Sequence, residues 1–268
     1  MKQPRDDGLG FRATLATQIR SLEALMVRDL MVRFGRGNLG FLWLLVEPML
    51  LTTGVLFIWS LAKGDQGDHG VGVAFIVFSG YMPITLWRHM TNNAIFGLRR
   101  NGSLLYHRHI TLLDTFVSRM LLEFAGTTTA LIVIAAVLIS FGLLEPIVNY
   151  RTMTIAWLVL AIYSFGGALV ICVLTEYSEI WERFIGPFQY LMLPLSGCFF
   201  MVDWLPTPAQ QLIWYNPITH CFEAFRDGLM GDAVTTHYEL WYPLAWGIAL
   251  IAIGLRMVDV VRDRIHFG

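Results

Sequence analysis

The stretch Arg33-Phe-Gly-Arg-Gly-Asn-Leu-Gly-Phe-Leu-Trp-Leu-Leu-Val-Glu-Pro48 takes the chain from a charged segment into its first long apolar run. Before it, leucine, methionine and phenylalanine recur at three- and four-residue steps between charged residues, which is the period of an amphipathic helix. After it, Phe41–Ala62 is apolar except for Glu47. A bilayer core about 30 Å thick needs roughly 20 such residues in a helix. The stretch therefore predicts an amphipathic segment, residues 1–40, that turns into a membrane span.

The same stretch contains the spacing G-x-G-x-x-G, from Gly35 to Gly40. In a dinucleotide-binding turn this spacing follows a strand, opens a helix and is answered about 20 residues later by an acidic ribose ligand. Here the upstream period is helical, and the next acids after Glu47 are Asp65 and Asp68, beyond an apolar run. We therefore interpret the glycines as a hinge at a membrane surface.

The composition indicates a membrane protein. Hydrophobic residues make up 56% of the chain and charged residues only 15%, whereas soluble domains carry about 25% charged residues. A net charge of −1 argues against nucleic acid as a partner. The three cysteines form no C-x-x-C pair or Cys/His cluster, so the sequence predicts no metal site and no disulfide framework.

Apolar runs predict an all-α integral membrane protein with six transmembrane helices in residues 41–261 and a tail at 262–268. The expected spans are Phe41–Ala62, Val71–Trp87 (extending through Met90–Phe96), Phe124–Leu144, Met153–Thr175, Phe184–Val202 and Leu240–Val261.

A further uncharged run, Trp204–Phe222, contains Pro206, Pro208 and Pro217. Each proline removes a backbone donor, and a broken helix in lipid would leave backbone groups unpaired. We therefore expect residues 203–239 to form short re-entrant or interfacial helices between spans five and six. A seventh span is the alternative.

The basic residues predict the orientation. Fourteen lysines and arginines lie on the side of the termini and three on the other, if the chain crosses six times. Because cytoplasmic loops are enriched in lysine and arginine, both termini are expected in the cytoplasm and residues 203–239 outside it.

The sequence holds none of the common catalytic signatures. The phosphate loop G-x-x-x-x-G-K-[ST], the nucleophile turn G-x-S-x-G and the zinc motif H-E-x-x-H are absent. Carboxylate clusters, which a proton- or sodium-coupled transporter places mid-membrane, are also absent from the predicted spans. If the protein transports a substrate, another subunit is expected to supply the energy.

Three features leave alternatives open. Glu47-Pro48 is either a gate at a pathway entrance or a solvated carboxylate at a helix start. The basic loop 97–114 is either an ordinary cytoplasmic loop or a short helix that docks in a partner's groove. The tryptophans and tyrosines between Trp204 and Trp246 are either an interfacial belt or platforms for sugar rings.

Two blocks of sequence resemble a known family. Met26–Pro48 is similar to the N-terminal signature of type-2 ABC exporter permeases for polysaccharides: a basic helix, R-[FY]-x-x-x-x-L-G-x-x-W, and an apolar run ending at proline. The second block resembles the fifth span and outer loop of that family: Leu195-Ser-Gly-Cys-Phe-Phe200, Leu205-Pro206, Tyr215-Asn-Pro-Ile-Thr-His220 and Glu223-Ala-Phe-Arg226. The likeness is greatest to capsular polysaccharide export permeases, and O-antigen and teichoic acid permeases share much of it.

The resemblance implies a homodimer in the inner membrane, bound to two copies of a separate ATPase that holds ATP and magnesium, with no cofactor in this chain. It implies export of a glycolipid-anchored polysaccharide, with a periplasmic co-polymerase and an outer-membrane channel as further partners. It places ATPase coupling at Arg99, Arg100, Leu104, Leu105, Tyr106, His107 and Arg108. It places the entrance at Arg33, Arg36, Gly37, Gly40, Glu47 and Pro48, and the exit path at Ser196, Gly197, Trp204, Trp214, Tyr215, Glu223 and Arg226.

Two other classes of function stay open. A membrane-embedded glycan or lipid transferase would need an acid–base set, for which His220, Glu223 and Arg226 are the only compact candidates. A scaffold without transport would tolerate polar substitutions in the spans.

Overall fold

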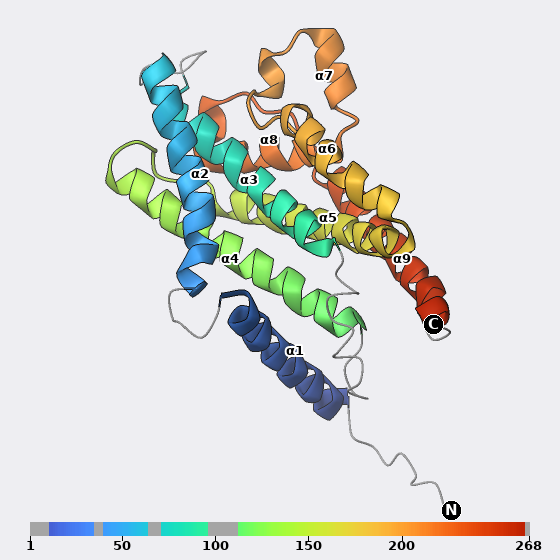
Figure 1. The fold of residues 1–268 in the computed structure, drawn as a ribbon. Helices are drawn as coiled ribbons and strands as arrows, with labels where there is room; N and C mark the ends of the chain where they lie inside the picture. The colour runs from blue at the N-terminus through green and yellow to red at the C-terminus, as the bar shows by residue number, and fades with distance from the viewer. Residues whose placement is uncertain (1–10, 35–39, 64–70, 96–111, 266–268) are drawn as a thin grey trace, which may run out of the picture.

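The computed structural model describes residues 11–34, 40–63, 71–95 and 112–265, and these ranges are almost entirely helical (Figure 1). The α-helices are α1 (Phe11–Phe34), α2 (Gly40–Lys63), α3 (Val73–Ala94), α4 (Leu112–Ser140), α5 (Tyr150–Tyr177), α6 (Glu179–Leu195), α7 (Thr207–Ile213), α8 (Pro217–Met230) and α9 (Trp241–Ile265). The 3-10 helices η3 and η4 cover Val202–Trp204 and Gly231–Ala233. The described ranges contain no strand, which confirms the predicted all-α class.

Within the described ranges, three helices are long and apolar enough to cross a membrane: Leu113–Ser140, Tyr150–Tyr177 and Trp241–Val258. They correspond to the third, fourth and sixth predicted spans. Helices α2, α3 and α6 lie where the first, second and fifth spans are expected. Because α1 ends at Phe34, the G-x-G-x-x-G segment follows a helix and not a strand, in agreement with our rejection of a dinucleotide site.

Two helix boundaries differ from the predicted ones. Helix α4 begins at Leu112 and not near Phe124, and its early polar residues have partners: Asp114 accepts a hydrogen bond from Gln18 of α1 (3.1 Å). Helix α6 ends at Leu195, well before Val202. The side-chain amide of Asn216 donates to the Leu195 carbonyl (2.7 Å), so the helix end is satisfied without a further turn.

Helix α5 is the centre of the fold and packs against α3, α6, α8 and α9. Its contact with α9 is very close: a Cβ on Gly166 would lie 2.7 Å from the carbonyl oxygen of Gly247. Small residues allow such approach between membrane helices, where van der Waals packing is the main attraction. The short helices α7 and α8 follow α6, as expected for residues 203–239.

Helix α1 lies along α4 and α2, with Leu25 buried between them. Its outer face exposes Ile19, Val27 and Met31. Figure 1 shows α1 and the C-terminal end of α9 at the end of the molecule opposite α7.

Candidate functional site

A buried arginine organises the loop between α6 and α9. Arg226 of α8 has no exposed surface. Its Nε donates to Ser79 Oγ of α3 (3.1 Å), one terminal nitrogen donates to the Phe200 carbonyl (2.7 Å), and the other donates to the Gly197 carbonyl (2.8 Å). A guanidinium group presents several donors in a fixed plane, so it can hold three segments at once.

Glu223 is the counter-ion of Arg226 and is equally buried. The two residues are three apart on α8, so their side chains share one helix face, and Arg226 donates to Glu223 Oε1 at 3.1 Å. The same carboxylate accepts the backbone N–H of Val202 (3.4 Å) and that of His237 (3.3 Å). The pair therefore fixes the turn after α6 and the segment before α9.

Two glycines let this turn rest directly on α3. Gly197 has φ +83°, a left-handed conformation that favours glycine. A Cβ on Gly80 of α3 would lie 2.0 Å from the Cys198 carbonyl oxygen. No side chain fits between Gly80 and the Cys198 backbone, so Gly80 is required for packing, whereas Gly197 is favoured by its backbone conformation.

His220 holds α7 against the start of α9. Its Nδ1 accepts the backbone N–H of Glu239 (3.0 Å), and its Nε2 lies 2.9 Å from the Trp214 carbonyl. A nitrogen that accepts carries no proton, so the ring is the neutral tautomer with the proton on Nε2. The ring also makes edge contacts with Trp214 and Tyr242.

A neighbouring tyrosine is tied to α8 in the same way. The Tyr238 hydroxyl donates to Asp227 Oδ2 (2.9 Å). Burial and this hydrogen bond raise the pKa of Tyr238 to about 12. The segment before α9 is thus attached to α8 through residues 220, 223 and 227.

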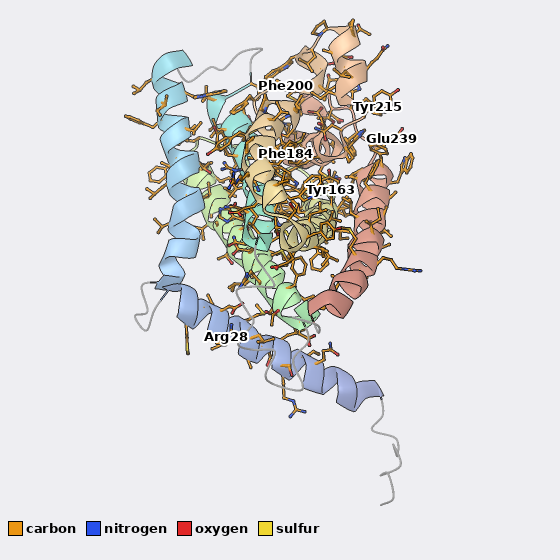
Figure 2. All side chains as sticks on the ribbon, turned by 45° about the vertical axis from the view of Figure 1, so that its right-hand side comes forward. Arg28, Tyr163, Phe184, Phe200, Tyr215 and Glu239 are labelled. Atoms are coloured by element: carbon orange, nitrogen blue, oxygen red, sulfur yellow. The ribbon has the colours of Figure 1, made fainter. Side chains whose placement is uncertain are left out.

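The predicted exit-path residues divide into two groups. Ser196, Gly197, Glu223 and Arg226 lie together around the buried ion pair. Trp204 is half-buried, while Trp214 and Tyr215 are exposed, with exposed fractions of 38% and 75%. Figure 2 shows Tyr215 and Glu239 at the same end of the molecule as Phe200. Their role in an exit path remains a prediction.

The other predicted groups lie mostly outside the described residues. Arg36, Gly37 and the coupling residues 99–108 are not described. Arg33 is in the last turn of α1, Gly40 is the first residue of α2, and Glu47 and Pro48 follow within α2.

The structure also reveals a polar junction that the sequence analysis did not single out. Near the end of α3, His89 Nδ1 lies 3.5 Å from Glu123 Oε2 of α4. Gln189 of α6 donates to Thr91 Oγ1 at 2.9 Å. These are the last turns of α3 before the predicted coupling loop. The sequence signals this junction only by a histidine at the end of one apolar run and a glutamine inside another.

None of these groups forms a reactive site. Within the described ranges there is no group of three or more histidine, cysteine, aspartate or glutamate residues that could hold a metal ion. Both ring nitrogens of His220 are engaged, and Glu223 and Arg226 have no exposed surface. The arrangement can position helices, but it offers no accessible acid–base set to a substrate.

The fold and the site define a helical membrane protein in which a buried ion pair holds the segment between α6 and α9 in place. A family model for ABC-2 type transporters matches residues 20–230, and the chain belongs to this family.

Several relatives match nearly the whole chain. The capsule polysaccharide export inner-membrane protein CtrC of Neisseria meningitidis serogroup B is 40% identical over 249 residues, which are 93% of this chain and 94% of that protein. The capsule polysaccharide export inner-membrane protein BexB of Haemophilus influenzae is 36% identical, covering 94% of this chain and 95% of that protein. The polysialic acid transport protein KpsM of Escherichia coli is 24% identical, covering 92% and 95%.

Proposed function

We propose that this chain is the membrane-spanning subunit of an ATP-driven exporter that moves lipid-linked capsular polysaccharide across the inner membrane. The observation that carries the proposal is the 40% identity to a capsule export protein over 93% of the chain, within the ABC-2 transporter family. An O-antigen export permease of Klebsiella pneumoniae is less similar, at 22% identity. This difference favours capsule over O-antigen as the substrate class.

In the proposed arrangement the chain crosses the membrane six times, with α2, α3 and α6 joining the three helices of clear membrane length. Both termini lie in the cytoplasm, and α7 and α8 lie near the outer surface. The position of α1 at the end opposite α7 supports this orientation (Figure 1). The apolar outer face of α1, with Ile19 and Met31, supports a place at the membrane surface.

The proposed complex contains two copies of this chain and two copies of a separate ATPase, which binds ATP and magnesium. The loop 97–114 would dock on the ATPase, and Arg33 and Arg36 would attract the anionic end of the glycolipid. A periplasmic co-polymerase and an outer-membrane channel would complete the route. The buried state of Glu223 and Arg226 weighs against the alternative of a transferase.

The test is replacement of the permease gene in an encapsulated strain. Wild-type chain is expected to restore surface polysaccharide and to co-purify with the ATPase. Arg99→Glu combined with Arg100→Glu is expected to lower ATPase co-purification several-fold, since both changes reverse charge in the docking loop. Arg151→Glu, at the other end of the spans, is the matched control. Undiminished co-purification of the ATPase would refute the coupling assignment, and failure of the wild-type chain to restore polysaccharide would refute the function.

A further inference from the structure

The exposed surface of α3 is unlike that of a lipid-facing helix. Seventeen of its 22 residues are buried. Of the five that remain, Asn92 is exposed, and Arg88, His89, Asn93 and Tyr81 are half-buried, with the Tyr81 ring packed edge-on against Phe199. By contrast, α2 exposes Leu50, Phe57, Ile58 and Leu61, and α9 exposes Ile248, Ile253 and Leu255. A helix that shows only polar groups faces water or a polar cavity and not hydrocarbon.

Three of these residues form a narrow stripe. At 3.6 residues per turn, Tyr81, Arg88 and Asn92 fall within roughly 40° of one another around the helix axis. The stripe covers 12 residues, with a rise of roughly 16 Å along the membrane normal if α3 is upright. The stripe has neighbours in and just after α6: Arg88 lies beside Tyr190, and Tyr81 lies beside Phe199.

Arg88 is the charged member of the stripe. Its guanidinium carbon lies 5.6 Å from the centre of the Tyr190 ring of α6. Tyr190 has an exposed fraction of 66%. In the part of the chain that the structure describes, no carboxylate lies within ion-pair distance of Arg88.

In the proposed orientation, Arg88 lies roughly 9 Å along the helix axis from the cytoplasmic end of α3. It lies six residues before the end of α3, and helix side chains lean toward the N-terminus, which here is away from the cytoplasm. Tyr190 lies 11 residues, or roughly 16 Å, past the start of α6, the end that is cytoplasmic in the proposed orientation. Counted from Phe184, where the fifth span is predicted to begin, Tyr190 lies roughly 9 Å inside the span, so the guanidinium is inside the proposed span toward its cytoplasmic end. Ionisable residues at that depth mark substrate pathways.

We propose that Arg88 and Tyr190 form a binding site for the carboxylate-bearing sugars of an acidic polysaccharide, on the surface of α3 that lines its path. The guanidinium donates two parallel hydrogen bonds to a sugar carboxylate. The exposed Tyr190 ring offers an apolar face to the C–H side of the same sugar ring. This inference rests on the proposed export function and adds the charge of the substrate to it.

The experiment measures binding to the full chain reconstituted in nanodiscs. The probes are hexagalacturonate, which carries a carboxylate on every sugar, and maltohexaose, a neutral hexasaccharide. Wild-type protein is expected to bind hexagalacturonate at least about tenfold more tightly than maltohexaose, as a charge-assisted contact requires. Added salt should weaken the binding of hexagalacturonate and leave that of maltohexaose unchanged.

Variants separate this site from general effects on the protein. Arg88→Gln should remove the tenfold preference. Arg88→Lys should keep part of it, because the charge remains without the planar pair of donors. Tyr190→Phe should bind as wild type, and Tyr190→Leu should bind both probes more weakly. Arg151→Gln, an exposed arginine at the start of α5, should change nothing.

The proposal would be overturned by equal affinity of wild-type protein for both probes, or by an unchanged preference in Arg88→Gln. Absence of any hexagalacturonate binding by wild-type protein would do the same. Each of these results is distinct from failure of the export function, which is judged by whether the wild-type chain restores surface polysaccharide. An Arg88→Gln chain that is made in normal amount and still co-purifies with the ATPase excludes misfolding as the cause of lost binding.

Discussion

At the residue scale, the ion pair of Arg226 and Glu223 has a structural role. The two charges are energetically coupled, so each one stabilises the burial of the other. Arg226 alone donates to two carbonyls, one hydroxyl and one carboxylate, and three of these four hydrogen bonds are buried. Removal of one partner from a buried pair leaves an uncompensated charge, which costs about 3–5 kcal/mol. We therefore expect Arg226→Met to lower the free energy of unfolding by about that amount, measured by denaturant unfolding of the purified protein in detergent.

The partner substitution tests this reason directly. Arg226→Met with Glu223→Gln should be more stable than Arg226→Met alone, because the buried negative charge is gone. Arg151→Met, an exposed substitution at the start of α5, should shift stability by less than about 0.5 kcal/mol. A double variant no more stable than the single one would show that the lost hydrogen bonds, and not the isolated charge, dominate.

The sequence predicts the grouping of this site but not its burial. Glu223 and Arg226 are close in the sequence, and the structure places both on α8, where they form an ion pair. The hydrogen bond from Arg226 to Ser79 joins residues 147 positions apart, and no local pattern predicts such a pair. In the sequence, Arg88 is only a charged residue near the end of an apolar run. Its significance comes from Tyr190 on another helix.

At the element scale, neighbouring glycines of α5 have opposite roles. A Cβ on Gly166 would meet the Gly247 carbonyl of α9 at 2.7 Å, whereas a Cβ on Gly167 would meet nothing within 4 Å. Gly166→Ala should therefore separate α5 from α9 and destabilise the protein by about 1–3 kcal/mol. Gly167→Ala should leave stability unchanged or raise it by about 0.5–1 kcal/mol, because alanine is the better helix former. Thermal unfolding in detergent compares the two, and equal effects would contradict the close α5–α9 contact.

The helices themselves were largely predictable, because long apolar runs in this composition have few alternatives to membrane-length helices. The predicted helix boundaries are wrong in two places. In one, polar residues extend a helix beyond its apolar run, and in the other, a turn ends a helix before its apolar run is complete. Hydropathy places the start of the third span near Phe124, but α4 begins at Leu112 because Asp114 has a partner on α1. Hydropathy extends the fifth span to Val202, but α6 ends at Leu195, before the left-handed Gly197. The first boundary depends on a contact between α1 and α4, and the second depends on the backbone conformation of the turn after α6.

At the scale of the whole molecule, the three exposed regions discussed above lie on one proposed route. The outer face of α1 would lie at the membrane surface on the cytoplasmic side, and the polar stripe of α3 would meet the substrate. Trp214 and Tyr215 lie beside the brace formed by His220, beyond the end of α6. The buried ion pair of α8 holds the segment between α6 and α9 in place, and the Tyr215 ring of this segment is exposed.

This route requires that Tyr215 and the start of α6 lie on opposite sides of the membrane. Tyr215 and Ile180 are nearly equally exposed, at 75% and 76%, and α6, which is roughly 25 Å long, lies between them. The native cysteines Cys172, Cys198 and Cys221 are buried, so the wild-type chain should react little with thiol reagents. A membrane-impermeant maleimide should label Tyr215→Cys in intact spheroplasts and Ile180→Cys only after lysis, because cytoplasmic loops hold the excess of arginine and lysine. Labelling of both from the outside would mean that α6 does not cross the membrane, and the inverse pattern would reverse the proposed orientation.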